Sequence, residues 1–213
     1  MGDVEMLKLQ VGAGLDGPAE WLNVDASPTL RLQRLPIVGG FLEGITRPRF
    51  SPSVVYGDVV RGLPLAPGSV QIVYSSHVLE HMAFEDFKTA LGEIHRVLRP
   101  GGIFRSVLPD LDLEVQSYLQ SSAPDRASEF MRSTLLGLER RERGLMGAMR
   151  LWLGNSRHVW MWDYGSLAHH LAEAGLSDIR PAVFGDSEEP AFVEVESRER
   201  WQDCLGFECR KPA

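Results

Sequence analysis

Short apolar runs with the alternation of strands are spaced along the chain between stretches of helical periodicity. Leu7–Val11 alternates apolar and polar positions and ends at a Gly-x-Gly turn, which predicts a strand. Six later runs have the length and the β-branched or aromatic content of strands: Trp21–Asp25, Val54–Val60, Val70–Tyr74, Ile103–Leu108, Ile179–Phe184 and Cys204–Arg210. The pattern therefore predicts seven strands.

Helical periodicity is clearest between Glu85 and Leu98, where apolar residues recur every three or four positions. Arg99–Gly102 follows with Pro and Gly, which predicts the end of this helix. A second helix is predicted over Tyr164–Ala174, before Gly175. Because strands and helices alternate, we expect an α/β fold with a doubly wound, mainly parallel seven-stranded sheet.

Three longer segments connect these elements. The segment 111–153 has a mainly helical pattern after the fifth strand, and predicts a helical insertion that serves as a lid or substrate-side segment at about 111–157. The acidic stretch Gly185–Asp203 predicts a loop. Leu30–Ser53 is longer than a minimal connection and contains Gly and Pro, so it predicts either a flap over a site or a plain surface loop.

The composition is that of an ordinary globular domain. The 213 residues are 44% hydrophobic and 24% charged, which excludes wholesale disorder and favours one domain over residues 1–213. Acidic residues outnumber Lys and Arg by 29 to 22, and the resulting charge of -7 disfavours nucleic acid as a partner. No signal-peptide pattern and no apolar run of roughly 20 residues is present, so we expect a cytoplasmic protein that does not bind membranes.

Small and polar residues follow most of the predicted strands at the point where each strand ends. In an open parallel sheet these strand ends meet at one edge, where ligands bind. Glycine allows close approach of the backbone to a ligand, and a carboxylate accepts hydrogen bonds from vicinal hydroxyls or an exocyclic amine. The residues in question are Gly12, Gly14, Asp25, Asp58, Ser75–His77 and Asp110. Together they predict a nucleoside site.

Each of these residues also has a purely structural explanation, since glycines and aspartates are common in turns and helix caps. Gly12-x-Gly14-x-x-Gly17 additionally matches a dinucleotide-binding fingerprint. That fingerprint has its acidic residue about 20 positions further on, after a full helix, and Asp25 comes too early. The agreement of Asp25 and Asp58 at one sheet edge is what favours a ligand site.

The chain resembles the class I S-adenosylmethionine-dependent methyltransferases over most of its length, and within them a small bacterial branch. The run from Val70 to Gly102 is the most specific part of the resemblance. The segments that carry it are Leu9–Gly14, Trp21–Asp25, Gly57–Asp58 with Leu63–Pro64, Val70–His81, Glu93–Gly102, Val107–Asp110 and Asp163–Leu167. The resemblance implies a Rossmann-like methyltransferase fold and S-adenosylmethionine as cofactor.

The resemblance also implies a role for each residue of the cofactor site. By analogy, Gly12 and Gly14 lie against the methionine part, Asp25 accepts from the ribose hydroxyls and Asp58 accepts from the adenine amine. The remaining residues of the implied site border the sulfonium or flank these groups: Ala13, Val59, Ser75, Ser76 and His77.

The connection between the first two predicted strands is unusually short. Only Leu15 to Trp21 separate Gly14 from the core of the next strand, whereas a parallel crossover normally needs a dozen or more residues. A helix therefore does not fit there, although a helix N-terminus at this place would help to hold the cofactor's carboxylate. We expect that contact to be made differently or to be weaker.

Methyl transfer to an activated sulfonium carbon depends mainly on alignment of the acceptor, and a base is needed only where the acceptor must lose a proton. The candidates for this catalytic role are Asp110, His158 and His81. We expect a small-molecule or glycan-like acceptor. Basic residues between Glu139 and Arg157 fit an acidic acceptor, but they equally fit a solvated helix face.

Two other functions remain compatible with the sequence. His77-Val-Leu-Glu80-His81 has the spacing of a His-x-x-Glu-His zinc peptidase motif, which requires a helix and a third ligand. We favour the methyltransferase and predict no metal. The short crossover is also compatible with a catalytically silent module that binds S-adenosylmethionine or a partner. The sequence leaves the oligomeric state open, a homodimer included.

Overall fold

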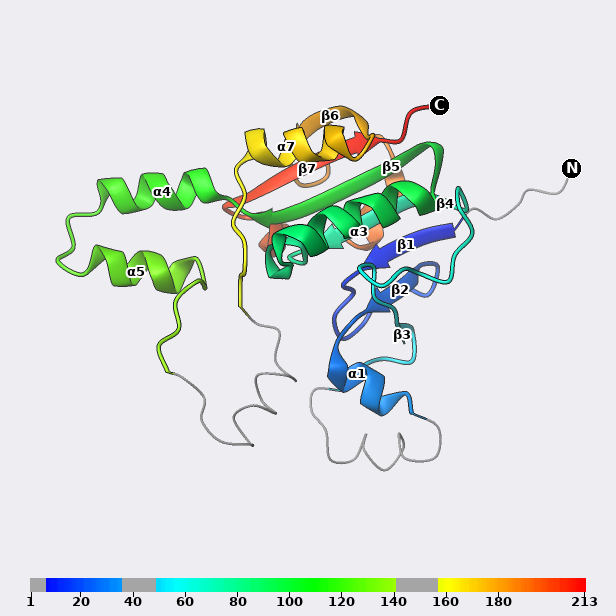
Figure 1. Cartoon of the computed structure of the whole chain (residues 1–213), viewed down its shortest axis with the longest axis horizontal. Coiled ribbons are helices and arrows are strands. Elements are labelled where there is room, and N and C mark those ends of the chain that lie inside the picture. The colour runs from blue at the N-terminus through cyan, green and yellow to red at the C-terminus, as the bar shows by residue number, and fades with distance from the viewer. Residues whose placement is uncertain (1–6, 36–48, 141–156) are drawn as a thin grey trace, which may run out of the picture.

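The computed structural model describes residues 7–35, 49–140 and 157–213 of the chain (Figure 1). Seven strands form one sheet in the order β3-β2-β1-β4-β5-β7-β6. β7 pairs antiparallel with β5 and with β6, and the other neighbours pair parallel. The strands are β1 (Leu7–Val11), β2 (Leu22–Asp25), β3 (Val54–Tyr56), β4 (Val70–Ser76), β5 (Leu98–Pro109), β6 (Ser177–Ala182) and β7 (Cys204–Arg210). This confirms the predicted sheet.

One face of the sheet is covered by α3 (Phe84–Val97) and α7 (Tyr164–Glu173). Both helices are amphipathic, and their apolar positions enter the larger of the two core clusters. Phe87 of α3 and Leu171 of α7 are fully buried there, together with Val73 of β4. The predicted helices therefore form, and they pack on the same side of the sheet.

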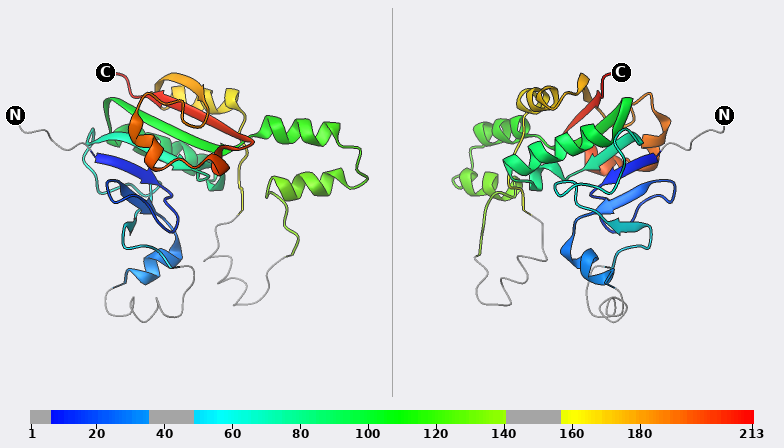
Figure 2. Two further views of the ribbon diagram at one scale, coloured as in Figure 1. Left: turned by 180° about the vertical axis from the view of Figure 1, so that it is seen from behind. Right: turned by 45° about the vertical axis from the view of Figure 1, so that its right-hand side comes forward.

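The opposite face is covered in an unexpected way, because no helix connects β1 to β2. The segment between β6 and β7 lies over this face instead and contains the 3-10 helix η2 (Pro190–Glu194) and α8 (Arg198–Trp201). Phe192 and Trp201 from this segment are buried in a second core cluster with Tyr74 of β4. The prediction of a simple loop over Gly185–Asp203 is therefore wrong, since its aromatic residues replace the missing helix (Figure 2).

Three predicted boundaries also differ from the structure. The third strand ends at Tyr56, because Gly57 and the turn at Asp58 follow directly. The helix before Arg99–Gly102 ends as predicted, but β5 begins at once, and a register shift relative to β4 accommodates the irregular start. The sixth strand lies two residues earlier than predicted, at Ser177–Ala182. Such shifts are typical of element ends.

The helical insertion after β5 consists, where it is described, of α4 (Leu111–Gln120) and α5 (Arg126–Ser133). The two helices pack on each other and project from the sheet in all three views, and neither contains a buried residue (Figures 1 and 2). The rest of the predicted lid, 141–156 with its arginines, lies outside the described residues, as does 36–48 of the predicted flap. A short helix, α1 (Pro28–Gln33), precedes that gap.

Among the described residues, no helix combines the length and the apolar character needed to cross a membrane. The two cysteines of β7, Cys204 and Cys209, are both free, and their odd separation along the strand directs them to opposite faces of the sheet.

Candidate functional site

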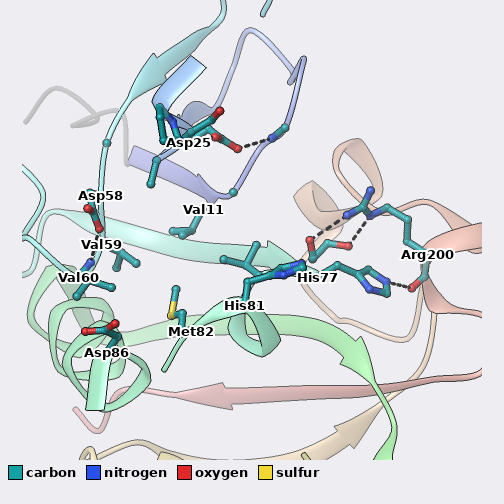
Figure 3. A pocket seen from close by; sticks show the side chains of 18 residues that line it. Val11, Asp25, Asp58, Val59, Val60, His77, His81, Met82, Asp86 and Arg200 are labelled. Carbon is teal, nitrogen blue, oxygen red and sulfur yellow. Dashed lines mark hydrogen bonds between the residues drawn. The ribbon is translucent and has the colours of Figure 1, made fainter. Parts of the chain in front are cut away.

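A pocket of about 390 Å³ opens at the carboxyl ends of the central parallel strands, within the size range of small-molecule sites. Residues after β1, β2, β3 and β4 line it, so it lies where the sequence predicts a ligand. Asp58 and Arg200 stand on opposite sides of the pocket, with Val11 and His77 between them (Figure 3). Of the predicted cofactor residues, seven line it: Gly12, Gly14, Asp25, Asp58, Val59, Ser76 and His77.

The loop after β1 is shaped by two glycines. Gly12 and Gly14 have φ angles of +68° and +69°, a region that residues with a side chain rarely adopt, and a side chain at Gly12 would collide with Val78. This conformation lets the backbone N–H of Gly14 donate to Oδ2 of Asp25 over 3.0 Å. The same turn that closes the short crossover therefore also positions the acidic residue at the end of β2.

Asp25 is partly buried at the rim of the pocket. Its second oxygen, Oδ1, accepts from the backbone N–H of Ser27 over 2.8 Å. Burial raises the pKa of Asp25 above its usual value, and the two backbone hydrogen bonds, from Ser27 and Gly14, oppose that rise. The carboxylate is thus oriented by the backbone on both sides.

Asp58 occupies the far side of the pocket on the loop after β3. Its Oδ1 accepts from the backbone N–H of Val60 over 3.0 Å, and Oδ2 lies 3.2 Å from Nε of Arg61. This loop is tied to α3, because Oε1 of Glu93 accepts from the backbone N–H of Leu63 over 2.6 Å. The position of Asp58 therefore depends on α3 as well as on β3.

The predicted residues at the end of β4 divide between the pocket and the core. Ser76 lines the pocket, whereas Ser75 is fully buried, with its hydroxyl 2.8 Å from that of Ser106. The prediction that Ser75 borders the ligand does not agree with this placement, because successive side chains of a strand point to opposite faces. Ala13 also lies outside the pocket lining.

His77 follows β4 with a φ of 55° and bridges the sheet to α8. Its Nε2 donates to the backbone carbonyl of Arg200 over 2.9 Å and lies 3.9 Å from Sγ of Cys204, while Nδ1 lies 3.3 Å from Oε1 of Glu80. The contacts with Cys204 and Glu80 raise the pKa of His77 to about 10. These contacts favour the protonated form of the ring.

Arg200 of α8 is a pocket residue that the sequence did not reveal. Its Nε donates to Oγ of Ser76 over 2.8 Å and its Nη2 to the carbonyl oxygen of Ser76 over 3.0 Å. No ion pair within the described part of the chain involves Arg200. No sequence pattern marks this residue, since the fold of the β6–β7 segment alone brings it to the end of β4.

The three predicted acceptor-side residues are placed very differently. Asp110 caps α4: its Oδ1 accepts from the backbone N–H groups of Asp112 and Leu113, and it does not line the pocket. His81 lines the pocket. His158 does not line the pocket but packs against His81, and the centres of the two imidazole rings lie 5.1 Å apart. Burial lowers the pKa of His158.

The peptidase arrangement of the His77–His81 motif does not form. His77 has a positive φ and precedes the 3-10 helix η1 (Leu79–His81), so the two histidines do not lie one α-helical turn apart. His77 instead contacts α8, and Nδ1 of His81 lies 2.6 Å from the carbonyl oxygen of Arg157. The zinc peptidase alternative is therefore not supported.

Comparison with known proteins agrees with this geometry. Residues 9–106 match a family model described as a methyltransferase domain. A search of curated proteins finds no match. Among solved structures, a complex of the Haloferax volcanii Trm112 methyltransferase activator with a methyltransferase matches with a TM-score of 0.51 and 18% identity, over 98% of this chain and 83% of that chain.

Two further structures have the same fold. A methyltransferase from Archaeoglobus fulgidus matches with a TM-score of 0.52 and 13% identity, over 97% of this chain and 86% of that chain. Haemonchus contortus phosphoethanolamine N-methyltransferase 2, solved with S-adenosylmethionine, matches with a TM-score of 0.51 and 14% identity, over 98% of this chain and 49% of that chain. Residues 9–106 thus match a methyltransferase domain, and the chain shares the fold of these solved methyltransferases.

Proposed function

We propose that this chain binds S-adenosylmethionine in the pocket between Asp58 and Arg200 and transfers its methyl group to a small-molecule or glycan-like acceptor. The observation that carries the proposal is the order of charges along the pocket, with Asp58 at one side, Asp25 at the rim beside the glycine turn and Arg200 at the other side. S-adenosylmethionine presents an amine, two ribose hydroxyls and a carboxylate in the corresponding order.

The two carboxylates suit the nucleoside half of the cofactor. An ionised carboxylate accepts hydrogen bonds only, so Asp58 matches the adenine amine and Asp25 matches the ribose hydroxyls. Oδ2 of Asp25 is engaged with the Gly14 N–H and Oδ1 with the Ser27 N–H, but each oxygen has a second lone pair for a ligand hydroxyl. Both side chains therefore fit without rearrangement.

Arg200 suits the carboxylate of the methionine half. A guanidinium carries five N–H donors, and two nitrogens of Arg200 are used on Ser76, while no hydrogen bond involves Nη1 among the described residues. Arg200 lines the same pocket as the glycine turn after β1, so its positive charge can take over the contact with a carboxylate that a helix N-terminus would make there. Gly12 and Gly14 leave room for the cofactor between Arg200 and Asp25.

His81 and Met82 mark the acceptor side of the pocket. Both line it from η1 and the residue after it, opposite the strand β1 (Figure 3). His158 packs against the ring of His81 without lining the pocket, so any influence of His158 on an acceptor would act through His81. Asp110 has the geometry of a helix cap, and we assign it no contact with the acceptor.

The test is a calorimetric titration of the purified chain with S-adenosylhomocysteine. We expect Asp25→Ala to reduce affinity at least about tenfold, because it removes charge-assisted hydrogen bonds worth roughly 1.5 to 3 kcal/mol. Asp16→Ala is the matched control, since Asp16 lies in the connection between β1 and β2, outside the pocket lining. Unchanged affinity in a folded Asp25→Ala variant would remove the proposed pose.

A silent cofactor-binding module is the second candidate, favoured by the absence of a helix between β1 and β2. It predicts binding of S-adenosylhomocysteine with no methyl transfer to any acceptor. Release of S-adenosylhomocysteine from S-adenosylmethionine, screened across hydroxyl, amine and glycan acceptors, distinguishes the two functions.

A further inference from the structure

Glu80 is a fully buried carboxylate at the bottom of the acceptor side, and the cofactor pose makes no use of it. Neither of its side-chain oxygens has a hydrogen-bond partner among the described residues. Nδ1 of His77 lies 3.3 Å from Oε1, which is an ion-pair contact without hydrogen-bond geometry. Burying an ionised carboxylate is costly unless it is paired and hydrogen-bonded, and both oxygens of Glu80 have lone pairs that a further ligand could use.

Two imidazoles beside Glu80 each have one ring nitrogen engaged by a backbone carbonyl. Nδ1 of His81 lies 2.6 Å from the carbonyl oxygen of Arg157, and Nδ1 of His158 lies 2.8 Å from that of Thr134. A carbonyl oxygen only accepts, so each Nδ1 donates a proton to it, and the tautomer with its proton on Nδ1 has a lone pair on Nε2. Metal-binding histidines have this arrangement, with the second nitrogen donating to a backbone carbonyl.

The two segments that carry these side chains are fastened to each other. The backbone carbonyl of Glu80 accepts from the N–H groups of Val159 and Trp160, over 2.7 and 3.1 Å. This pairing sets His158 beside Glu80, with Nε2 3.9 Å from Oε1, and one ligand atom from each of Glu80, His81 and His158 lies within 4.8 Å of the others. The cluster is therefore built by main-chain contacts and does not depend on long surface side chains.

We propose that Glu80, His81 and His158 form a binding site for a divalent first-row transition metal ion of the Zn²⁺ type. Two imidazoles and one carboxylate are a ligand set that such ions prefer. In a tetrahedral Zn²⁺ shell neighbouring ligand atoms lie about 3.4 Å apart, so the three side chains need to close inward by about 1 Å. Rotation of the Glu80 carboxylate and the two rings supplies this movement.

The site has an open side toward the pocket. His81 lines the pocket, so the remaining coordination position faces the acceptor side, as in zinc sites with three protein ligands and one exchangeable position. An oxygen of an acceptor or a water fits this position. Only this last step rests on the proposed function, because the three ligands are defined without reference to the cofactor.

A second group of similar composition serves as the control. His169, His170 and Glu173 lie on the outer part of α7, where His169 and Glu173 are largely exposed. Hydrogen bonding already joins His170 to Glu173 over 2.8 Å, and solvent satisfies the exposed groups. This group therefore lacks the buried unsatisfied carboxylate that distinguishes the Glu80 cluster.

The experiment measures Zn²⁺ binding by the chelator-treated full-length chain in competition with a chromophoric chelator. We expect one equivalent of Zn²⁺ to bind and to raise the melting temperature. His158→Gln and Glu80→Gln should each weaken binding at least about a hundredfold, and His169→Gln should leave it unchanged. Glu80→Gln keeps the size and shape of the side chain, so it gives a second variant to measure if His158→Gln does not fold.

Two results would overturn the proposal: no saturable binding by the wild-type chain up to 100 µM Zn²⁺, or binding that survives in folded Glu80→Gln and His158→Gln but disappears in His169→Gln. A parallel titration with S-adenosylhomocysteine keeps the two proposals apart. Zn²⁺ binding without nucleoside binding would refute the cofactor pose and leave the metal site standing, and the reverse result would refute only the metal site.

Discussion

The indole N–H of Trp21 donates to Oε2 of Glu194 over 2.9 Å, joining the β1–β2 connection to η2 across 173 positions of sequence. Lys8 of β1 pairs with the other oxygen of the same carboxylate at 3.2 Å. The segment between β6 and β7 is thereby fixed over the sheet face that has no helix of its own. The same segment carries Arg200, which lines the pocket. The fold of this one segment therefore accounts both for the covered sheet face and for the proposed contact with the cofactor.

Trp201 is the residue on which this covering segment depends most. It is 93% buried against the sheet, donates to the hydroxyl of Tyr74 over 3.3 Å and stacks on the guanidinium of Arg105, 4.5 Å from its ring centre. We expect Trp201→Ala to lower the free energy of unfolding by about 3 to 5 kcal/mol, measured by urea denaturation. Val193→Ala in the same segment is the control and should change little, because Val193 is 75% exposed. Equal effects of the two substitutions would contradict the proposed packing role.

Glu93 of α3 binds the loop that carries Asp58 through a hydrogen bond from the Leu63 N–H, and its contribution to stability depends on pH. Hydrogen bonding to Arg96 holds the pKa of Glu93 below its usual value of about 4.5, in spite of desolvation. A carboxyl whose pKa is lowered by folding adds stability above the unfolded-state pKa, and this contribution is lost as the pH falls through the lower folded-state pKa. Glu93→Gln should therefore destabilise the chain near neutral pH and lose its effect in acid.

Urea midpoints of wild type and Glu93→Gln at about pH 7 and about pH 3 test this expectation. Glu85→Gln is the control, since Glu85 lies on the same helix, is largely exposed, and its carboxylate has an ion pair only with Lys88, at 3.6 Å, within the described part of the chain. A difference between wild type and Glu93→Gln that stays constant from neutral pH to acid would show that the carboxylate charge contributes nothing. In that case the hydrogen bonds that Arg96 donates to the carbonyl oxygens of Leu63 and Leu65 would hold the loop together with its packing.

The positions of Asp25 and Asp58 could be predicted from the sequence, because the carboxyl ends of parallel strands meet at one edge of a sheet and both residues follow such strands. The absence of a helix between β1 and β2 could be predicted as well, from the small number of residues in that connection alone. The assignment of Ser75 failed because strand ends alternate between the two faces, and a prediction that groups neighbouring residues cannot separate Ser75 from Ser76.

Arg200 could not be predicted, for a different reason. Its contact with Ser76 spans 124 positions and depends on how the β6–β7 segment folds over the second face of the sheet. That segment is acidic and lacks periodicity, so its burial follows from a few aromatic residues such as Phe192, whose partners are fixed only in the folded chain. Local sequence patterns do not predict contacts between residues that lie so far apart in the chain.

Substitution of Arg200 tests how the amino-acid end of the cofactor is held. We expect Arg200→Met to weaken binding of S-adenosylhomocysteine roughly 10- to 100-fold, because a charge-assisted contact with a carboxylate is lost. Methylthioadenosine lacks that carboxylate, so its affinity should change little. Arg198→Met is the matched control on the same helix, since Arg198 stacks on Phe184 and does not line the pocket.

Calorimetry of both ligands with both variants decides the assignment. If Arg200→Met weakens both ligands equally, Arg200 supports the pocket only through its hydrogen bonds to Ser76. If it weakens neither, the amino-acid end is held by the backbone after β1 or is held weakly, as the short crossover alone predicts.

Two substitutions at Asp110 separate capping of α4 from a role toward the acceptor. Asn caps helices about as well as Asp, so Asp110→Asn keeps the hydrogen bonds to the N–H groups of Asp112 and Leu113 while it removes the charge. Asp110→Ala removes both and should cost about 0.5 to 2 kcal/mol of stability. Because Asp110 lies outside the pocket lining, we expect Asp110→Asn to retain wild-type turnover once an acceptor is found, whereas His81→Gln should reduce turnover more than cofactor affinity. A folded Asp110→Asn variant that binds S-adenosylhomocysteine normally but turns over slowly would restore the acceptor-side role that the strand-end position predicts, since only the negative charge distinguishes it from wild type.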